Sequence, residues 1–144
     1  MQYKDITHRT ASTPQLEKLL NSYFKIFPRF TFPFLPFIIA AFFQSMAWMS
    51  GPIFLSNYTL GPRMLLLILF AVGEYVFMSP AMNAGVEILG MHEPHLVIEY
   101  HITTLIVFIL VNIYIFKKKF NMKYLSAFIF GGAAVYMANM ADTE

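Results

Sequence analysis

The sequence contains no cysteine, and only 12% of its 144 residues are charged. The absence of cysteine excludes structural disulfides, thiolate metal sites and a cysteine nucleophile. Ordinary soluble domains carry about 25% charged residues, so this chain is too apolar to be one of them. Its formal charge of +2 is small, and its basic residues lie beside apolar runs, which argues against nucleic acid as a partner. These shortages indicate an integral membrane protein whose first partner is the lipid bilayer.

The short motifs of the common enzyme classes are also missing. The chain has no nucleophile elbow, phosphate-binding loop, dinucleotide fingerprint or metalloprotease helix. We therefore expect neither catalysis nor a cofactor. The residues before the first long apolar run lack a compact apolar core and a small-residue cleavage site, so we expect no cleavable signal.

Long apolar runs make up most of the chain, since 58% of its residues are hydrophobic and 16 are Phe. In lipid, only helices and closed barrels satisfy their backbone hydrogen bonds, and these runs are too long and continuous for barrel strands. Each has roughly the 20 residues that cross the hydrocarbon core. We predict an all-α integral membrane fold over residues 34–141, followed by a short tail at 142–144. Its four transmembrane helices are expected at about Phe34–Leu55, Pro62–Leu89 with a kink at Pro80, Val97–Phe116 and Lys123–Ala141.

Residues 1–33 are predicted to form a polar tail and an amphipathic helix that begins at Ser12 or Thr13. Three prolines, Pro28, Pro33 and Pro36, separate this helix from the first span. A basic amphipathic helix of this kind lies in the membrane surface or, alternatively, packs against a partner subunit. Its apolar face recurs at helical spacing and consists of Leu16, Leu19, Leu20, Tyr23, Phe24 and Phe27.

In the fourth predicted span, small residues repeat at four-residue spacing. Such a stripe allows two helices to approach closely within a membrane. We therefore predict a helix-packing face formed by Ala127, Gly131, Ala134 and Ala138.

The positive residues divide evenly between the two sides of a four-span topology. Five lie on the side of the amino terminus and five on the other side. Fewer of the first group lie close to a span end, so the positive-inside rule slightly favours a cytoplasmic or equivalent position for the Lys117–Lys123 loop. The identity of the membrane stays open between a bacterial inner membrane, an organelle and a virion envelope.

Glu74 is a carboxylate within the otherwise apolar run Arg63–Ser79. A charge in hydrocarbon costs several kcal/mol, so such residues usually face a protein or water-filled interior and mark a binding or proton site. We predict His101 as its partner, because a carboxylate and an imidazole can share a proton in a dry bundle. The alternative is that Glu74 is a hydrogen-bonded packing residue. The predicted polar site also includes Tyr75, Tyr100, Asn83, Gln44 and Trp48.

Three histidines and two glutamates between His92 and His101 resemble a set of metal ligands. Pro94 separates His92 from His95, so these two rings are not held on one helical face. A transition-metal site needs three or four convergent ligands with supporting hydrogen bonds. We therefore predict no metal site here.

Short motifs between Gln44 and Ala138, about two thirds of the chain, agree in order and spacing with a known family. They are Met46-Ala47-Trp48 in the first span, Glu74-Tyr75 and Pro80-Ala81 in the second, Thr104-Leu105 and Phe108 in the third, and Ala127-Phe128 and Ala134-Val135-Tyr136 in the fourth. The chain thus resembles the four-helix family called domain of unknown function 486, which is grouped with the drug/metabolite transporter superfamily. The resemblance implies a transporter-like helical scaffold.

The chain departs from the family pattern at its polar positions. Where the family tends to carry Asn-Arg in the second helix, this chain has Met82-Asn83. Where the family tends to carry glutamine, lysine and then Gln-Glu near the third helix, this chain has His95, Val97 and Tyr100-His101. Glu74 is retained, but most of the polar residues expected around it are replaced.

Two functions follow as expectations. The first is a non-catalytic structural or accessory subunit of a larger membrane assembly, with other membrane subunits or further copies of the chain as partners. The second is a small proton-coupled or facilitative transporter of an organic solute or cation. The transporter hypothesis expects Glu74 to face a cavity with a polar or aromatic lining, whereas the accessory hypothesis expects Glu74 to be packed dry.

Overall fold

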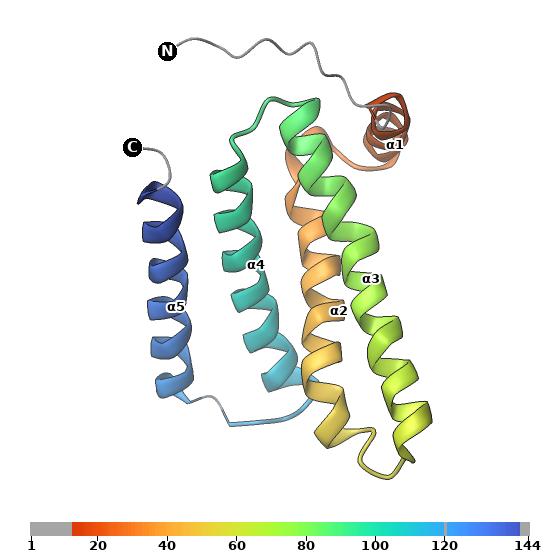
Figure 1. Cartoon of the computed structure of the whole chain (residues 1–144), viewed down its shortest axis with the longest axis vertical. Coiled ribbons are helices and arrows are strands. Elements are labelled where there is room, and N and C mark those ends of the chain that lie inside the picture. Colours follow the sequence, from red (N-terminus) through yellow and green to blue (C-terminus); the bar gives the residue numbers. More distant parts are fainter. Residues whose placement is uncertain (1–12, 120, 142–144) are drawn as a thin grey trace.

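The computed structural model describes residues 13–119 and 121–141, the last helix in part by its backbone alone, and all the regular elements in these ranges are helical. They are α1 (Thr13–Ile26), the 3-10 turn η1 (Arg29–Thr31), α2 (Phe34–Ile53), α3 (Leu60–Glu87), α4 (Glu93–Tyr114) and α5 (Met122–Ala141). The four long helices run up and down beside one another, and α1 lies across the flank of α3 (Figure 1).

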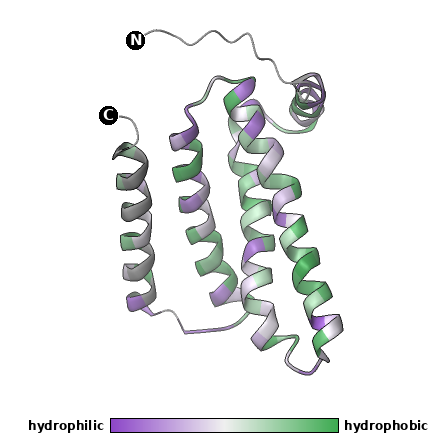
Figure 2. Ribbon diagram, in the orientation of Figure 1, coloured by the Kyte–Doolittle hydropathy of each residue, from purple (hydrophilic) through white to green (hydrophobic). Residues whose placement is uncertain are grey.

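In the described part of the chain, three segments are long and apolar enough to cross a membrane: Arg29–Ile53, Leu60–Glu87 and Glu93–Tyr114, with mean hydropathies of 1.6, 1.9 and 2.0. Figure 2 shows hydrophobic residues along most of α2 and α3. The first three predicted spans therefore coincide with apolar helices, and α3 continues as a helix through Pro80. At the place of the fourth predicted span the structure has the helix α5, and its passage through the membrane stays a prediction.

The third span begins four residues before the predicted Val97. His92 has an extended backbone at the N-cap, Glu93 lies in the first turn, and Pro94 follows it. A proline is favourable in the first helical turn, where its missing N–H has no partner to lose, and an acidic residue there complements the helix dipole. Hydropathy alone misses this polar first turn.

The helix α2 is central, because it packs against both α3 and α4, while α5 packs against α4 and α1 against α3. Phe37 and Leu96 are fully buried at the centre of this packing. The buried core that joins α2, α3 and α4 consists of Phe37, Ala40, Ala81, Leu96 and Tyr100.

Close helix approach occurs at two glycines of α3. A Cβ atom on Gly73 would lie 2.7 Å from the ring of Phe43 on α2, and one on Gly85 would lie 2.7 Å from Cδ1 of Leu96 on α4. The predicted stripe on α5 is different, because the space beside Gly131 is open. The side chains of Ala127, Ala134 and Ala138 lie outside the described residues, so close packing at this stripe stays a prediction.

The helix α1 is described from Thr13 onward, and Ser12, the other predicted starting residue, lies outside the described residues. Of its predicted apolar face, Leu16 and Leu20 are buried, while Leu19 is 57% exposed. A hydrogen bond of 2.6 Å between the Tyr23 hydroxyl and Thr31 Oγ1 ties the helix to the following turn. Part of the apolar face thus packs within the chain, and a position in the membrane surface stays a prediction.

Candidate functional site

The contact between Gly73 and Phe43 determines where Glu74 lies. Because Gly73 has no side chain, the backbone of α3 comes close to the Phe43 ring of α2. Glu74 and Gln44 are the next residues of their respective helices. The close approach therefore brings the Glu74 carboxyl group near the polar part of α2, in the middle of α3.

The partner of Glu74 is Tyr100 of α4. The Tyr100 hydroxyl donates a hydrogen bond of 2.8 Å to Glu74 Oε1, and Gln44 Oε1 is a second acceptor at 3.4 Å. Tyr100 is only 7% exposed, and its ring packs edge-on against Phe37 at 5.2 Å between centroids. One hydroxyl thus joins polar groups from three apolar helices.

The prediction that His101 is the partner of Glu74 is wrong. The ring Nδ1 of His101 lies 2.7 Å from the carbonyl oxygen of Val97 on its own helix, where an N–H can donate. Successive residues of a helix point about 100° apart, and the packing of α2 and α3 is on the side of Tyr100. His101 instead points away from the contact with Glu74.

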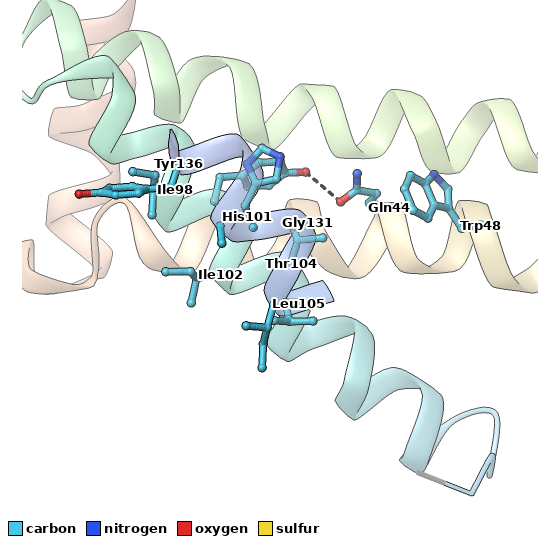
Figure 3. Close-up of a pocket in the computed structure, with 13 residues that line it drawn as sticks. Gln44, Trp48, Ile98, His101, Ile102, Thr104, Leu105, Gly131 and Tyr136 are labelled. Carbon is cyan, nitrogen blue, oxygen red and sulfur yellow. Dashed lines mark hydrogen bonds between the residues drawn. The ribbon is translucent and has the colours of Figure 1, made fainter. Parts of the chain in front are cut away.

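A cavity of about 720 Å³ lies on the side of Tyr100 and His101, between α2, α4 and α5. Figure 3 shows Gln44 and Trp48 reaching it from α2, His101 and Thr104 from α4, and Tyr136 from α5. The dashed line that ends on Gln44 marks its hydrogen bond with Tyr100, which also lines the cavity. Glu74 is not among the described lining residues, and its connection to the cavity is the hydrogen bond from Tyr100, which lines it.

The cavity assembles only part of the predicted polar site. Gln44, Trp48, Tyr100 and His101 line it, whereas Tyr75 and Asn83 are exposed residues of α3 outside it. Tyr136 was missed as a site residue, because no local pattern indicates which face of the last helix meets α4.

Replacing Tyr100 with phenylalanine is expected to lower the free energy of unfolding by about 1 kcal/mol, a usual value for a hydrogen bond between membrane helices. The ring can keep its contact with Phe37, but Glu74 loses its donor. Unfolding in mixed micelles titrated with sodium dodecyl sulfate measures the change. Tyr75→Phe is the matched control, because Tyr75 is 61% exposed; equal losses in both variants would contradict the assigned hydrogen bond.

Two rings of the histidine cluster at the start of α4 contact each other. His92 and His95 pack edge to face at 5.7 Å between ring centroids. Within the described ranges, no group of three His, Asp or Glu side chains is close enough to hold a metal ion.

Three apolar helices of membrane-spanning length, joined by a polar contact between their side chains, define an integral multi-pass membrane protein. The chain belongs to the family DMT_6, a domain of unknown function (DUF486) placed provisionally in the drug/metabolite transporter (DMT) superfamily, which it matches over residues 33–139. The resemblance noted in the sequence is thereby confirmed. No curated protein and no solved structure matches the chain.

Proposed function

We propose that the chain transports a small organic cation through the cavity between α2, α4 and α5. Members of this superfamily are generally transporters. The observation that carries the proposal is that Tyr100 lines the cavity and donates its hydroxyl hydrogen bond to Glu74. The cavity volume of about 720 Å³ lies within the usual range of small-molecule sites, about 300–1,000 Å³.

The chemistry of the lining favours a cation. Among the described residues of the lining, the aromatic rings that can face a cation are those of Trp48, Tyr100 and Tyr136, and none of these described residues is Asp, Glu, Lys or Arg. Aromatic faces attract organic cations, most strongly where water is excluded. Glu74 lies directly behind Tyr100 and supplies the negative charge that such a solute requires.

Glu74 also supports coupling to protons. A carboxyl group surrounded by hydrocarbon is stable when it holds a proton or when it stands opposite a cation. Exchange of the proton for a bound cation would couple the transport of the cation to the transport of the proton. When Glu74 takes up a proton, the Tyr100 hydroxyl can turn its hydrogen bond toward Gln44, which is its second acceptor.

The proposal includes α5 as a fourth span and α1 as a helix at the membrane surface. The helix α5 has 20 residues, which is enough to cross the hydrocarbon core. Four helices enclose little space, so we expect the transporting unit to contain more than one copy.

An accessory subunit of a larger membrane assembly is the second candidate. It is favoured by the separation of Glu74 from the cavity lining. It is also favoured by the apolar end of the amino-terminal segment, where Ile26 is 74% and Phe30 is 81% exposed.

Uptake of benzyltrimethylammonium into vesicles that contain the purified chain tests the proposal. We expect uptake above that of protein-free vesicles when the vesicle interior is more acidic than the outside, so that protons leave as the cation enters. Trp48→Ala should reduce uptake about three- to ten-fold, because an aromatic face for the cation is lost. Tyr58→Ala is the control, since Tyr58 is exposed in the α2–α3 loop and does not line the cavity. Uptake equal to that of protein-free vesicles would exclude transport of this probe and favour the accessory subunit.

A further inference from the structure

A second cavity lies between α1 and the last turns of α3. Its volume is about 460 Å³, and Leu16 and Leu20 of α1 form one wall while Ala81 and Ala84 of α3 form the opposite wall. We call it the α1–α3 groove. The other residues used in the argument are Tyr23, Phe32, Val76 and Phe77, which also line it.

The lining of the α1–α3 groove is hydrocarbon in character. The single polar side-chain atom that its lining residues carry is the Tyr23 hydroxyl, and this hydroxyl is hydrogen-bonded to Thr31 Oγ1 at 2.6 Å. Apolar cavities without polar partners do not hold ordered water. Its occupant must therefore be apolar where it contacts these walls.

The depth of the groove fits a lipid chain. The residues of α3 that line the groove run from Val76 to Ala84, which corresponds to roughly 12 Å along the helix axis at 1.5 Å per residue. Ala84 lies within one turn of the end of α3 at Glu87, and the hydrocarbon core of a bilayer is about 30 Å thick. The groove thus extends from near one end of the helix toward the middle of the membrane.

The side chain of Arg29 lies near the groove. The Arg29 guanidinium lies over the Phe24 ring, 5.6 Å from its centroid. The Phe24 ring is in turn in edge contact with Phe32 at 6.2 Å between centroids, and Phe32 lines the groove. Basic side chains at this level attract the phosphate groups of anionic lipids.

We propose that the α1–α3 groove binds one acyl chain of an anionic phospholipid, with the phosphate held by Arg29. The acyl chain fills the space that α1 and α3 leave between them next to Leu16 and Leu20. This site is separate from the cavity beside Tyr100 and does not depend on the transport proposal.

Native mass spectrometry of the full chain in a nonionic detergent tests the lipid site, with dioleoyl phosphatidylglycerol and dioleoyl phosphatidylcholine as probes. We expect one phosphatidylglycerol to be retained per chain under conditions that remove phosphatidylcholine. Arg29→Gln should reduce the retained lipid about five-fold, the effect of one basic side chain near a lipid phosphate. Lys118→Gln, a change of an exposed lysine beyond α4, should have no effect.

A second pair of variants tests the groove itself. Val76→Trp places an indole at the groove and should abolish lipid retention, whereas Val72→Trp changes an equally exposed residue one turn away that does not line it. The proposal would be overturned if the chain retained the two lipids equally, or if the two tryptophan variants retained phosphatidylglycerol equally. It would also be overturned if the chain were a dimer without bound lipid. Circular dichroism verifies the helix content, and if Val76→Trp fails to fold, the comparison of Arg29→Gln with Lys118→Gln decides.

Discussion

Replacing Glu74 with glutamine is expected to abolish proton-driven uptake of benzyltrimethylammonium in reconstituted vesicles. Glutamine has nearly the same shape, and its side-chain oxygen can still accept the hydrogen bond from Tyr100 that Glu74 accepts at 2.8 Å. It cannot release a proton or carry a charge, so the exchange of proton for cation is lost. Uptake should fall to the level of protein-free vesicles while the helix content and the free energy of unfolding change little.

Glu93→Gln is the control for this experiment. Glu93 is an exposed carboxylate in the first turn of α4 and lies outside the cavity. Its loss should leave uptake unchanged, because the carboxyl group is not connected to Tyr100. Undiminished uptake by Glu74→Gln would exclude Glu74 as the coupling group. A large loss of stability in Glu74→Gln, combined with no uptake by the unchanged chain, would instead support the accessory subunit.

Replacing Gly85 with leucine is expected to lower the free energy of unfolding by about 3 kcal/mol or more, within and above the usual range for overpacking a core. Even a Cβ atom at this position would lie 2.7 Å from Leu96 Cδ1, and Leu96 is fully buried. A leucine adds three further carbon atoms beyond this Cβ, so Leu96 must change its conformation or α3 and α4 must separate. Denaturation in mixed micelles measures the loss, and the hydrogen bond between Tyr100 and Glu74 should weaken with it.

Gly61→Leu is the matched variant, because Gly61 is in the same helix and a Cβ atom there has nothing within 4 Å. Leucine has a higher helix propensity than glycine by up to about 1 kcal/mol. The change at Gly61 should therefore be neutral or stabilising. If the two variants were destabilised equally, the contact between Gly85 and Leu96 would not be a close packing point.

The positions of the helices could be predicted because hydropathy is a local property of the chain. The apolar runs around Phe34–Ile53 and Leu60–Glu87 are visible without any knowledge of their neighbours. The two close contacts of α3 could not be predicted, since Gly73 and Gly85 look like ordinary glycines of an apolar helix. What makes them important is the side chain opposite each of them, which is Phe43 or Leu96.

The choice between Tyr100 and His101 shows the same limit for the site. The sequence indicates that Glu74 needs a polar partner, and chemistry alone favours an imidazole. Adjacent residues of a helix point in directions about 100° apart, so only the orientation of α4 determines which of the two meets α3. The structure shows that Tyr100 is the residue that does so.

The sequence by itself determined that this protein lies in a membrane, where its apolar helices fall, and that Glu74 requires a partner, because transfer of residues into hydrocarbon depends on composition and length. The tertiary structure alone decided that Tyr100 is this partner, that a cavity lies beyond it and that α1 leaves a groove on α3. These features depend on the rotation of each helix about its axis and on contacts between residues far apart in the chain, which no local pattern specifies.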